Sequence, residues 1–450
     1  MGETLDRPPL PPGPNWTNIG VALRASPPIY LLNLFKKYGE IARFKGAFTV
    51  YAINNPDCVK NILTSAWPQY SKNTIDYKVI STVFGNGLVT SDGNDWARQR
   101  RIMQPVFSSR SVNSFDKIIN DTTAALADNW STKSIDDPIW LDRDMSKITF
   151  QVVSRTLFGT NIDHVSDEMI DILDLLNIHP MRLSALLRLF PWIPSPSNKR
   201  FHRANRRLDE IVYALIEEHR APDACQENIV GRLLAAKDED SKASLTAEQI
   251  RDEVVTLMLA GHETSAVSLT WTFYLLSQYP EIEERLCEEL ETKLNGAPAT
   301  SSDLAELTYL KQVVQESLRL YPAVWGIARR SLDEVTLGGY CIPENSYIAI
   351  TPYVLHRDPK HWPEPEKFDP ERFSPGQIKS RHSYSYLPFG AGPRTCIGAG
   401  MAMLEIQLIL AQLLQRFKVT PITDQRIEVE AAVTLKPRYG LKVCLEPRIK

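Results

Sequence analysis

The longest uninterrupted helical pattern of apolar and polar residues runs from about Leu245 to Tyr279. Thr246 and Gln249 have the spacing of a capping box at its start, and Pro280 ends it. At about 1.5 Å per residue, a helix of this length spans roughly 50 Å. The sequence therefore predicts one helix that crosses a whole domain.

Two further helices are predicted in the second half of the chain. The first runs from about Thr308 to Leu320 and ends before Pro322, because proline cannot continue a helix. The second begins after Gly398 and runs to about Phe417. Its apolar residues recur at helical spacing and mark one buried face: Leu404, Leu408, Ile409 and Leu413.

Strand patterns are fewer and shorter. Residues Ile41–Ile53 alternate loosely around Gly46 and predict a β-hairpin, and Val335–Leu337 and Tyr347–Ile350 predict two short strands. From His356 to Thr395, prolines and glycines predict irregular structure for about 40 residues. A loop of that length inside a compact domain is usually functional.

The rest of the chain gives no sign of a second domain. We find no internal repeat and no composition break, so residues 1–450 are expected to form a single, mainly α domain with a minor β part, entered by a Pro-rich segment at 1–15. With 43% hydrophobic and 23% charged residues the composition is that of a globular protein. The net charge of −3 gives no indication of a nucleic-acid partner.

The cellular setting is predicted from what the chain lacks. No stretch of about 18 apolar residues occurs, so no transmembrane anchor is expected, and the N-terminus does not resemble a signal peptide. The six cysteines are scattered without a CxxC pair, which suits a reducing cytoplasm. We therefore expect a cytoplasmic monomer, in which any cysteine-ligated metal is held by a single thiolate.

The chemistry is concentrated at the end of the long loop, in residues Phe389–Gly398 directly before a helix. Gly390 and Gly392 permit a tight turn with backbone N–H groups aimed inward. Cys396 lies at the start of the helix, where the helix dipole is expected to lower the pKa of the thiol. Arg394 is close enough in sequence to reach an anionic group beside a metal.

These ten residues match, position for position, the F-G-x-G-x-R-x-C-x-G loop that binds haem in the cytochrome P-450 family, and the chain is similar to that family. The resemblance implies the family's mainly α, triangular-prism fold. It also implies haem b, with the haem between the long central helix and the helix after the cysteine loop. Cys396 is then the axial ligand of the haem iron, and Phe389 and Gly398 belong to the cofactor site.

Another family element is an ion-pair cluster. Glu316 and Arg319 have the E-x-x-R spacing and share one helix face. Arg372, within Pro370–Phe373, resembles the arginine that completes the family's Glu-Arg-Arg cluster. If the three charges are buried they need one another, so their expected role is structural: to lock the loop that presents Cys396.

The long helix carries Ala260-Gly261-His262-Glu263-Thr264, which resembles the family's oxygen-activation segment. Ala260 and Gly261 are expected to leave space for a diatomic ligand. The Thr264 hydroxyl can bond to the Ala260 carbonyl and loosen the helix, and Glu263 can relay protons from solvent. Without the cysteine loop, the same residues would fit an ordinary polar patch on a half-buried helix.

Trp96 and Arg100 resemble the W-x-x-x-R of the family's haem-propionate helix. Together with Arg329 and Arg394 they would supply donors to the two propionate carboxylates. Arg330 is adjacent to Arg329, and only one of the two can point inward.

Other polar features have ordinary explanations. His356 and His361 lie in a Pro-rich loop without a third ligand, and we expect surface residues rather than a metal site. The basic run Lys199–Arg207 follows an apolar stretch at 186–193. It is expected to be a solvated helix face, with a peripheral membrane contact as the alternative.

The resemblance implies a monooxygenase that places one atom of O₂ in a hydrophobic small molecule and releases the other as water. The electrons would come from NAD(P)H through a separate ferredoxin or flavodoxin/flavoprotein reductase partner. Arg98 and Arg101 are candidates for the docking face. The family's substrate pocket would draw on stretches that are mainly apolar here: Thr74–Leu88, Ile178–Ile193, Leu257 and Ala260, Ala323–Ile327 and Val433–Leu435.

Two alternatives remain from the sequence. The nearer keeps the fold but acts as a peroxygenase, or as an isomerase or dehydratase of oxygenated lipids, without an electron donor. The intact pair Glu263 and Thr264 argues against it, because such enzymes need no proton relay. The more distant alternative is a non-catalytic haem sensor or carrier.

Overall fold

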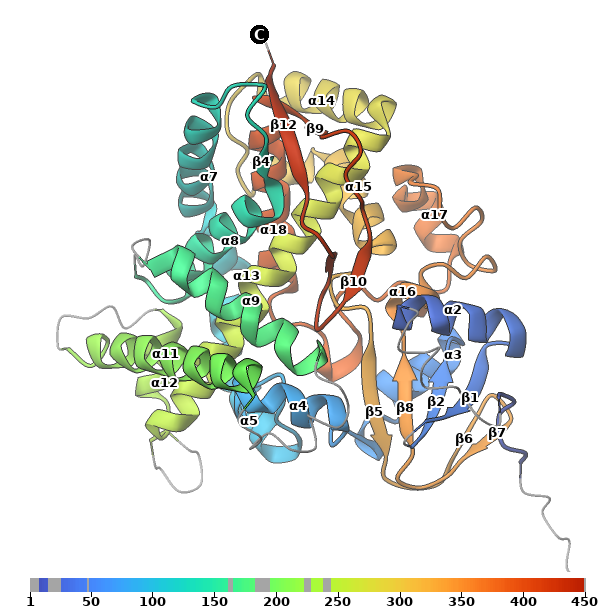
Figure 1. Ribbon diagram of the computed structural model, residues 1–450. Helices are drawn as coiled ribbons and strands as arrows, with labels where there is room; N and C mark the ends of the chain where they lie inside the picture. Colours follow the sequence, from blue (N-terminus) through green and yellow to red (C-terminus); the bar gives the residue numbers. More distant parts are fainter. Residues whose placement is uncertain are drawn as a thin grey trace, which may run out of the picture.

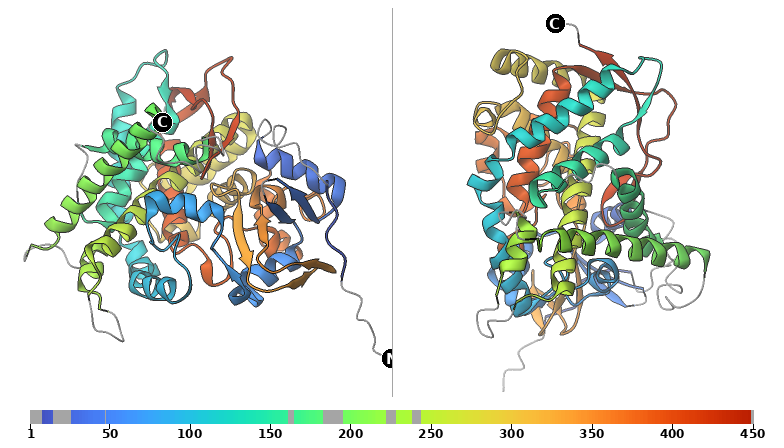
Figure 2. Two further views of the ribbon diagram at one scale, coloured as in Figure 1. Left: turned by 60° about the horizontal axis from the view of Figure 1, so that its bottom comes forward. Right: turned by 90° about the vertical axis from the view of Figure 1, so that its left-hand side faces the viewer.

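Helices form most of the computed structural model, which describes residues 8–14, 26–46, 48–160, 165–182, 195–221, 228–237 and 244–448. The outline is roughly triangular, with helices on one side and most of the strands on the other (Figures 1 and 2). Besides α13, α14, α15 and α18, which are treated below, the helices are α2 Pro27–Tyr38, α3 Pro56–Lys60, α4 Ile75–Phe84, α5 Gly93–Met103, α6 Ser109–Asn113, α7 Asp116–Ser131, α8 Leu141–Leu157, α9 Ser166–Arg182, α11 Pro196–Glu218, α12 Ile229–Ala235, α16 Pro352–Leu355 and α17 Pro375–Ser380.

The long predicted helix is α13, Ala247–Gln278, and the predicted capping box is present at its start. The Gln249 N–H donates to the Thr246 hydroxyl at 3.1 Å, and the Thr246 N–H donates to the Gln249 side chain at 2.9 Å. Pro280 begins a new helix, α14 Pro280–Leu294, since proline is well placed in a first turn.

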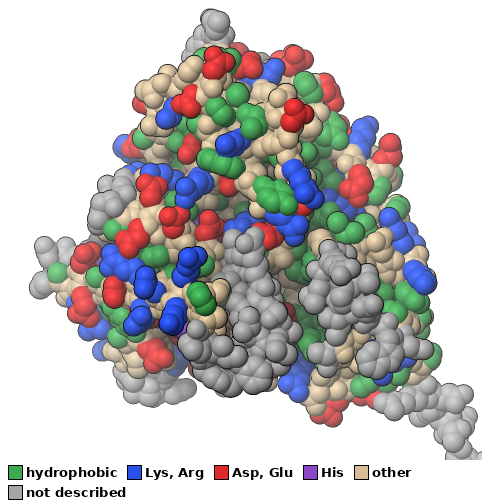
Figure 3. All heavy atoms as spheres, viewed as in Figure 1, with side chains coloured by type: hydrophobic (Ala, Val, Ile, Leu, Met, Phe, Trp, Pro, Cys, Tyr) green, Lys and Arg blue, Asp and Glu red, His purple; other side chains and the backbone are tan. Residues whose placement is uncertain are grey.

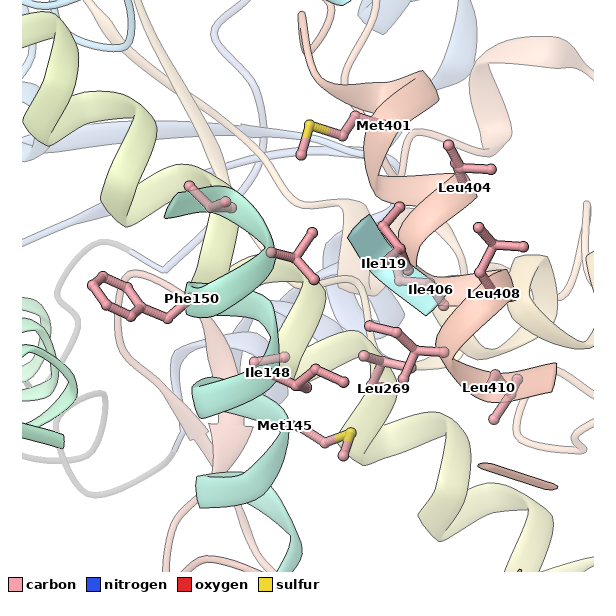
Figure 4. Close-up of a cluster of buried hydrophobic side chains, with 14 of the residues drawn as sticks. Ile119, Met145, Ile148, Phe150, Leu269, Met401, Leu404, Ile406, Leu408 and Leu410 are labelled. Carbon is pink, nitrogen blue, oxygen red and sulfur yellow. The ribbon is translucent and has the colours of Figure 1, made fainter. Parts of the chain in front are cut away.

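The main core forms where α8 and α18 (Ala399–Leu414) pack on α13. Figure 4 shows Met145 and Ile148 of α8, Leu269 of α13, and Leu408 and Leu410 of α18 in this cluster, and all five are fully buried. Each such side chain contributes about 1.5–3 kcal/mol relative to exposure. This packing fixes α13 and α18, the two helices that border the candidate site.

The predicted hairpin is confirmed as β1 Ile41–Lys45 and β2 Thr49–Ile53. It belongs to a five-stranded sheet of order β1-β2-β8-β5-β3, in which β8 runs parallel to β2 and the other pairs are antiparallel. The other strands of this sheet are β8 Tyr347–Ile350, β5 Ile327–Ser331 and β3 Tyr70–Ser71.

Strand β5 was missed by the sequence analysis, because its Ile-Ala-Arg-Arg-Ser sequence has no regular alternation of apolar residues. The two strands that were predicted nearby exist but lie in different sheets. Val335–Leu337 is β6 and pairs only with β7, Tyr340–Ile342, whereas β8 joins the large sheet.

The C-terminal part corrects the predicted end of the last helix. α15 has the predicted bounds, Thr308–Leu320, but α18 ends at Leu414 rather than near Phe417. Phe417 instead starts a strand and pairs with Pro447. The C-terminal strands are β9 Phe417–Pro421, β12 Lys442–Pro447 with its second neighbour β4 Ile139–Trp140, and the hairpin β10 Val429–Ala431 with β11 Leu435–Pro437.

Residues 356–395 are not wholly irregular, as the sequence analysis expected. They include the short helix α17 and three 3₁₀ turns, at Pro370–Phe373, Ser383–Ser385 and Gly392–Arg394. Pro375 occupies the first turn of α17, and Pro370 and Pro393 lie in the first turns of two of the 3₁₀ segments, where a missing N–H group costs nothing. The prolines therefore begin structure here rather than prevent it.

The basic run lies on α11, and Figure 3 shows Lys and Arg side chains gathered over this part of the molecule. Lys199, Arg200 and Arg203 are exposed, while Arg207 pairs with Glu168 at 2.8 Å. The surface is thus a solvated helix face with its own ion pairs. In the described part of the chain, no helix combines the length and the apolar character needed to cross a bilayer.

Candidate active site

A cavity inside the molecule brings the cysteine loop opposite the middle of α13. It is lined by apolar side chains over most of its wall and by cations at one end. Glu263 does not line it. The residues from the sequence analysis that do are Trp96, Arg100, Ala260, Gly261, Thr264, Arg329, Phe389, Arg394, Cys396 and Gly398.

The cysteine loop folds back on itself. The Cys396 N–H donates to the Phe389 carbonyl at 2.9 Å, which closes the turn. Gly390 and Gly392 have φ of 71° and 68°, a region that side chains rarely adopt. A Cβ atom on Gly392 would also lie 2.0 Å from the Leu63 carbonyl oxygen, so only glycine fits there.

The Cys396 thiol opens onto the cavity but lies deep in the protein. Burial raises its pKa, and the Gly398 N–H and the charge of Arg100 lower it less than burial raises it. The expectation of a lowered pKa is therefore wrong for the protein alone. Burial is the main physical reason. In addition, α18 starts only at Ala399, three residues later, so that the thiol has one N–H donor rather than a whole helix terminus.

The cationic end of the cavity is built from three elements. Arg100 of α5 donates to the Thr395 carbonyl at 2.7 Å. Arg394 pairs with Asp92 and its guanidinium lies 3.8 Å from the centre of the Trp96 ring. Arg329 of β5 lines the cavity, while its neighbour Arg330 is not among the lining residues. Side chains alternate along a strand, so the two arginines face opposite ways.

Lys72 joins these cations and was missed, because a single lysine in a polar stretch carries no sequence signal. Its ammonium donates to the Val89 carbonyl at 2.8 Å and lines the cavity. Burial, and after it the charges of Arg329 and Arg394, hold the pKa of Lys72 well below its usual value. So many cations in one buried place favour an anionic ligand there. A haem, with an iron for the thiol and two carboxylates for the cations, fits this arrangement.

The α13 wall differs from expectation in two details. The Thr264 hydroxyl does donate to the Ala260 carbonyl at 2.7 Å, but the helix continues unbroken through this point. A Cβ on Gly261 would lie 2.9 Å from a methyl carbon of Val153 in α8. Gly261 therefore allows α8 to approach α13, and only its backbone faces the cavity.

Glu263 lies at the boundary of two smaller cavities. Its carboxylate accepts a hydrogen bond from the Thr434 hydroxyl at 2.7 Å. The apolar cavity is lined by Ile80, Val83, Phe84, Val89, Leu176, Leu259, Ala260, Glu263, Thr264, Val324, Val433 and Thr434. The polar cavity includes Asp142, Arg143, Ser146, Asp174, Glu263, Thr270, Glu430, Lys436 and Arg438.

Segments that line these cavities include four of those expected for the substrate pocket. They are represented by Tyr77 and Leu88, Leu257, Ala323 to Ile327, and Val433 with Thr434. The side chains of the fifth, 178–193, lie outside the described residues.

The end of α4 and the loop after it are held against α13 by three consecutive polar side chains. Arg251 donates to the Val83 carbonyl at 2.9 Å, and Asp252 accepts from the Asn86 N–H at 2.7 Å. Glu253 accepts from the Leu88 N–H at 3.0 Å. Residues 251–253 therefore fix the segment that places Leu88 in the cavity wall.

The structure brings Glu316, Arg319 and Arg372 together. Arg319 and Glu316 are fully buried and form two hydrogen bonds, of 2.7 and 2.8 Å. Arg372 lies 3.3 Å from the same carboxylate and is 11% exposed. Arg319 also donates to the carbonyls of His356, Pro365 and Lys367. The cluster therefore joins α15 to the chain that leads to the cysteine loop.

His356 is fully buried, so the expectation of a surface residue is wrong for it. Its Nδ1 bonds to the Arg319 carbonyl at 3.1 Å, and its Nε2 accepts the Leu387 N–H at 2.7 Å. Burial lowers its pKa to about 3, so the ring is neutral and can accept this bond. His361 is partly exposed, and the described residues contain no group of three or more potential metal ligands.

Comparison with known proteins agrees with this geometry. Residues 8–445 match the family model described as cytochrome P450. The chain belongs to the cytochrome P-450 family. It is a haem-dependent monooxygenase, and it shares this chemistry with relatives that cover nearly all of its length.

Two of the relatives of this cytochrome P-450 are proteins of Streptomyces, and a third is from mouse. Cyclooctatin synthase of Streptomyces melanosporofaciens is 32% identical, covering 95% of this chain and 93% of that one. Pentalenene oxygenase of Streptomyces avermitilis is 30% identical, covering 94% and 93%. Leukotriene-B4 omega-hydroxylase 3 of Mus musculus is 32% identical, covering 88% and 80%.

The fold of this cytochrome P-450 also matches a solved structure. The haem domain of cytochrome P-450DA superposes with a TM-score of 0.88 over 98% of both chains, at 24% identity. The predicted fold class, mainly α with small sheets, is confirmed.

Proposed function

We propose that this cytochrome P-450 hydroxylates a neutral, mainly hydrocarbon substrate of terpenoid type. The observation that carries the proposal is the apolar cavity that shares Ala260 and Thr264 with the larger cavity of Cys396. A substrate held there lies beside the same helix surface that borders the haem site.

Residues on two sides of the large cavity would hold the haem. Cys396 would ligate the iron, and Arg100, Arg329 and Arg394 would donate to the propionates, with Lys72 as a fourth cation. Trp96 keeps Arg394 in place through ring contact. When bound, the haem supplies oxygen activation, with electron donation from the thiolate favouring O–O cleavage.

The residues of α13 handle protons. Thr264 lines the large cavity. Its single O–H donates to the Ala260 carbonyl in this structure and would have to turn to donate toward the haem side, while its oxygen accepts from solvent. Glu263 lies between Thr264's apolar cavity and the polar cavity, and it supplies protons to Thr264. This pair is the reason to favour a monooxygenase over a peroxygenase that uses no such relay.

The charges around the apolar cavity favour a neutral substrate. Its described lining residues include Glu263 but neither lysine nor arginine. A fatty-acid carboxylate placed there would have no cation to pair with and a carboxylate nearby, and a buried unpaired charge is costly. The two Streptomyces relatives named above, an oxygenase of pentalenene and a cyclooctatin synthase, suit the terpenoid class better than the leukotriene hydroxylase does.

Electrons come from NAD(P)H through a ferredoxin, or through a flavodoxin or flavoprotein reductase. Arg101 is exposed and Arg98 partly exposed on α5, the helix whose Arg100 contacts the cysteine loop, so a partner there would be near the haem. We also propose a single-domain cytoplasmic monomer. The free thiols of Cys58, Cys287, Cys341 and Cys444 support a reducing compartment.

Ligand titration of the purified holoprotein tests the substrate class. Neutral terpene hydrocarbons and alcohols should shift the haem spin state, and fatty acids of the same size should bind at least about tenfold more weakly, a difference of about 1.4 kcal/mol. Tighter binding of the acids would overturn the proposal. Product formation with NAD(P)H, a ferredoxin and its reductase should exceed that with peroxide alone; the reverse would favour the peroxygenase.

A further inference from the structure

Glu263 is held by a residue far away in the sequence. Thr434 lies between β10 and β11, is 2% exposed, and donates its hydroxyl hydrogen to Oε1 of Glu263 at 2.7 Å. In Figure 1 the dark red hairpin descends to the centre of the molecule beside α13. Glu263 itself is 7% exposed, so this hydrogen bond forms in a nearly dry environment and counts for more than it would at a surface.

The turn that carries Thr434 is fixed independently of Glu263. The Trp271 indole donates to the Leu435 carbonyl at 2.7 Å, and the Leu435 N–H donates to the Ala323 carbonyl at 2.9 Å. The Trp325 indole donates to the Ala432 carbonyl at 2.8 Å. Because the donor is anchored on both sides, the carboxylate conforms to Thr434 rather than the reverse.

The polar cavity on the other side of Glu263 reaches the surface. Lys436 of β11 pairs with Asp174 at 2.9 Å, and the side chain of Asp174 is 50% exposed. Burial lowers the pKa of Lys436, but the charges of Asp174 and then Glu263 raise it, and the net shift of the pKa is upward. Lys436 therefore remains a cation that attracts the Glu263 carboxylate toward the polar cavity, while Thr434 holds one of its oxygens beside the apolar cavity.

We propose that Thr434 is a positioning residue for proton delivery. It keeps the Glu263 carboxyl at the boundary, where one oxygen can take a proton from solvent in the polar cavity and pass a proton toward Thr264. Only O–H bonds are broken and formed, and the carboxylate is regenerated, so no further reactant is needed. This inference rests on the relay role of Glu263 and Thr264 proposed above.

The test compares Thr434→Val, which keeps the shape and loses the hydroxyl, with Thr434→Ser, which keeps the hydroxyl. A hydrogen bond to a charged group changes an equilibrium by about tenfold or more. We therefore expect Thr434→Val to give about tenfold less product per NAD(P)H consumed, with more peroxide and a larger solvent deuterium isotope effect. Thr434→Ser should give much higher coupling than Thr434→Val. Because Thr434 also lines the apolar cavity, coupling is compared at saturating substrate, with the spin-shift dissociation constant measured for each variant.

A second readout does not depend on turnover. The infrared band of the Glu263 carboxyl, identified by its loss in Glu263→Gln, should shift in the resting Thr434→Val holoprotein and not in Thr434→Ser. Thr123→Val is the matched control, because its buried hydroxyl bonds only within α7, to the Ile119 carbonyl. It should leave both the band and the coupling unchanged.

The outcomes separate the two proposals. If Glu263→Gln uncouples turnover but Thr434→Val does not, the relay stands and the role of Thr434 is wrong. If Glu263→Gln leaves coupling intact, the relay itself is wrong. If Thr434→Val lowers coupling further in the Glu263→Gln background, Thr434 does not act through Glu263, and the inference fails.

Discussion

Replacement of Arg319 by lysine would test how the buried charge cluster supports the cysteine loop. A guanidinium group has five N–H donors, and each of those of Arg319 has an acceptor. These are the two Glu316 oxygens and the carbonyls of His356, Pro365 and Lys367, at 2.7–3.0 Å. Lysine keeps the charge but has three donors, so at least two of these five acceptors, three of which are fully buried, lose the hydrogen bond from residue 319.

Each buried acceptor left without a partner costs about 1–3 kcal/mol, so Arg319→Lys should lower the free energy of unfolding by about 2–6 kcal/mol. The free energy of unfolding of a natural domain is about 5–15 kcal/mol, so this loss is a large fraction of the total stability. Arg319→Ala should lower the free energy of unfolding further, because the Glu316 charge would remain buried and unpaired. No stable holoprotein is expected for this variant.

Denaturant unfolding of the holoprotein, followed by circular dichroism and by the haem Soret band, measures the loss. Arg372→Lys is the matched control: its side chain is 11% exposed and its Nε lies 3.3 Å from the same carboxylate, so its midpoint should fall less than half as far. An Arg319→Lys protein with an unchanged midpoint and full haem content would refute the reasoning.

The remaining predictions concern the site and its surroundings. Cys396→Ser should abolish the strongly red-shifted Soret band of the ferrous–CO complex, and an unchanged spectrum would contradict thiolate ligation. Thr264→Ala should release more peroxide and less product per NAD(P)H consumed; intact coupling would show that the hydroxyl has no part in the relay. Burial raises the pKa of Glu253 to about 8 from 4.5, so the folded state keeps a proton that the unfolded chain has lost, and stability falls as the pH rises from 4.5 to 8. Glu253→Gln should remove this dependence and be the more stable protein at pH 8, by a few kcal/mol, in unfolding measured across that range; parallel curves would disprove it.

Local pattern predicted the elements whose ends carry their own signals. α13 has a capping box and a following proline, and α15 ends just before Pro322, so their bounds agree within about two residues. The cysteine loop was found because its chemistry is concentrated in ten consecutive residues. In each case the information lies within one segment of the chain.

The parts that could not be predicted depend on contacts between distant segments. Thr434 is 171 residues from Glu263, and His356 is 31 residues from the Leu387 N–H that it accepts. β5 forms because two neighbouring strands pair with it, not because its residues prefer a strand. No residue next to Lys72 in the sequence belongs to the cationic end of the cavity, so no local motif marks it. The same holds for Gly261, whose packing against Val153 is visible only in three dimensions.

Strand β5 links the two ends of the active site in a way that matters for protein engineering. Ile327 and Arg329 both face the large cavity from one strand that is paired on both sides. Ile327 is two residues from Arg329 on this strand, so a library that varies Ile327 to accept larger substrates should be screened for cofactor retention as well as for selectivity. Val324 lies before the strand and borders both the large and the apolar cavity. Directed evolution of selectivity at Val324 can therefore proceed without loosening the cationic end of the site.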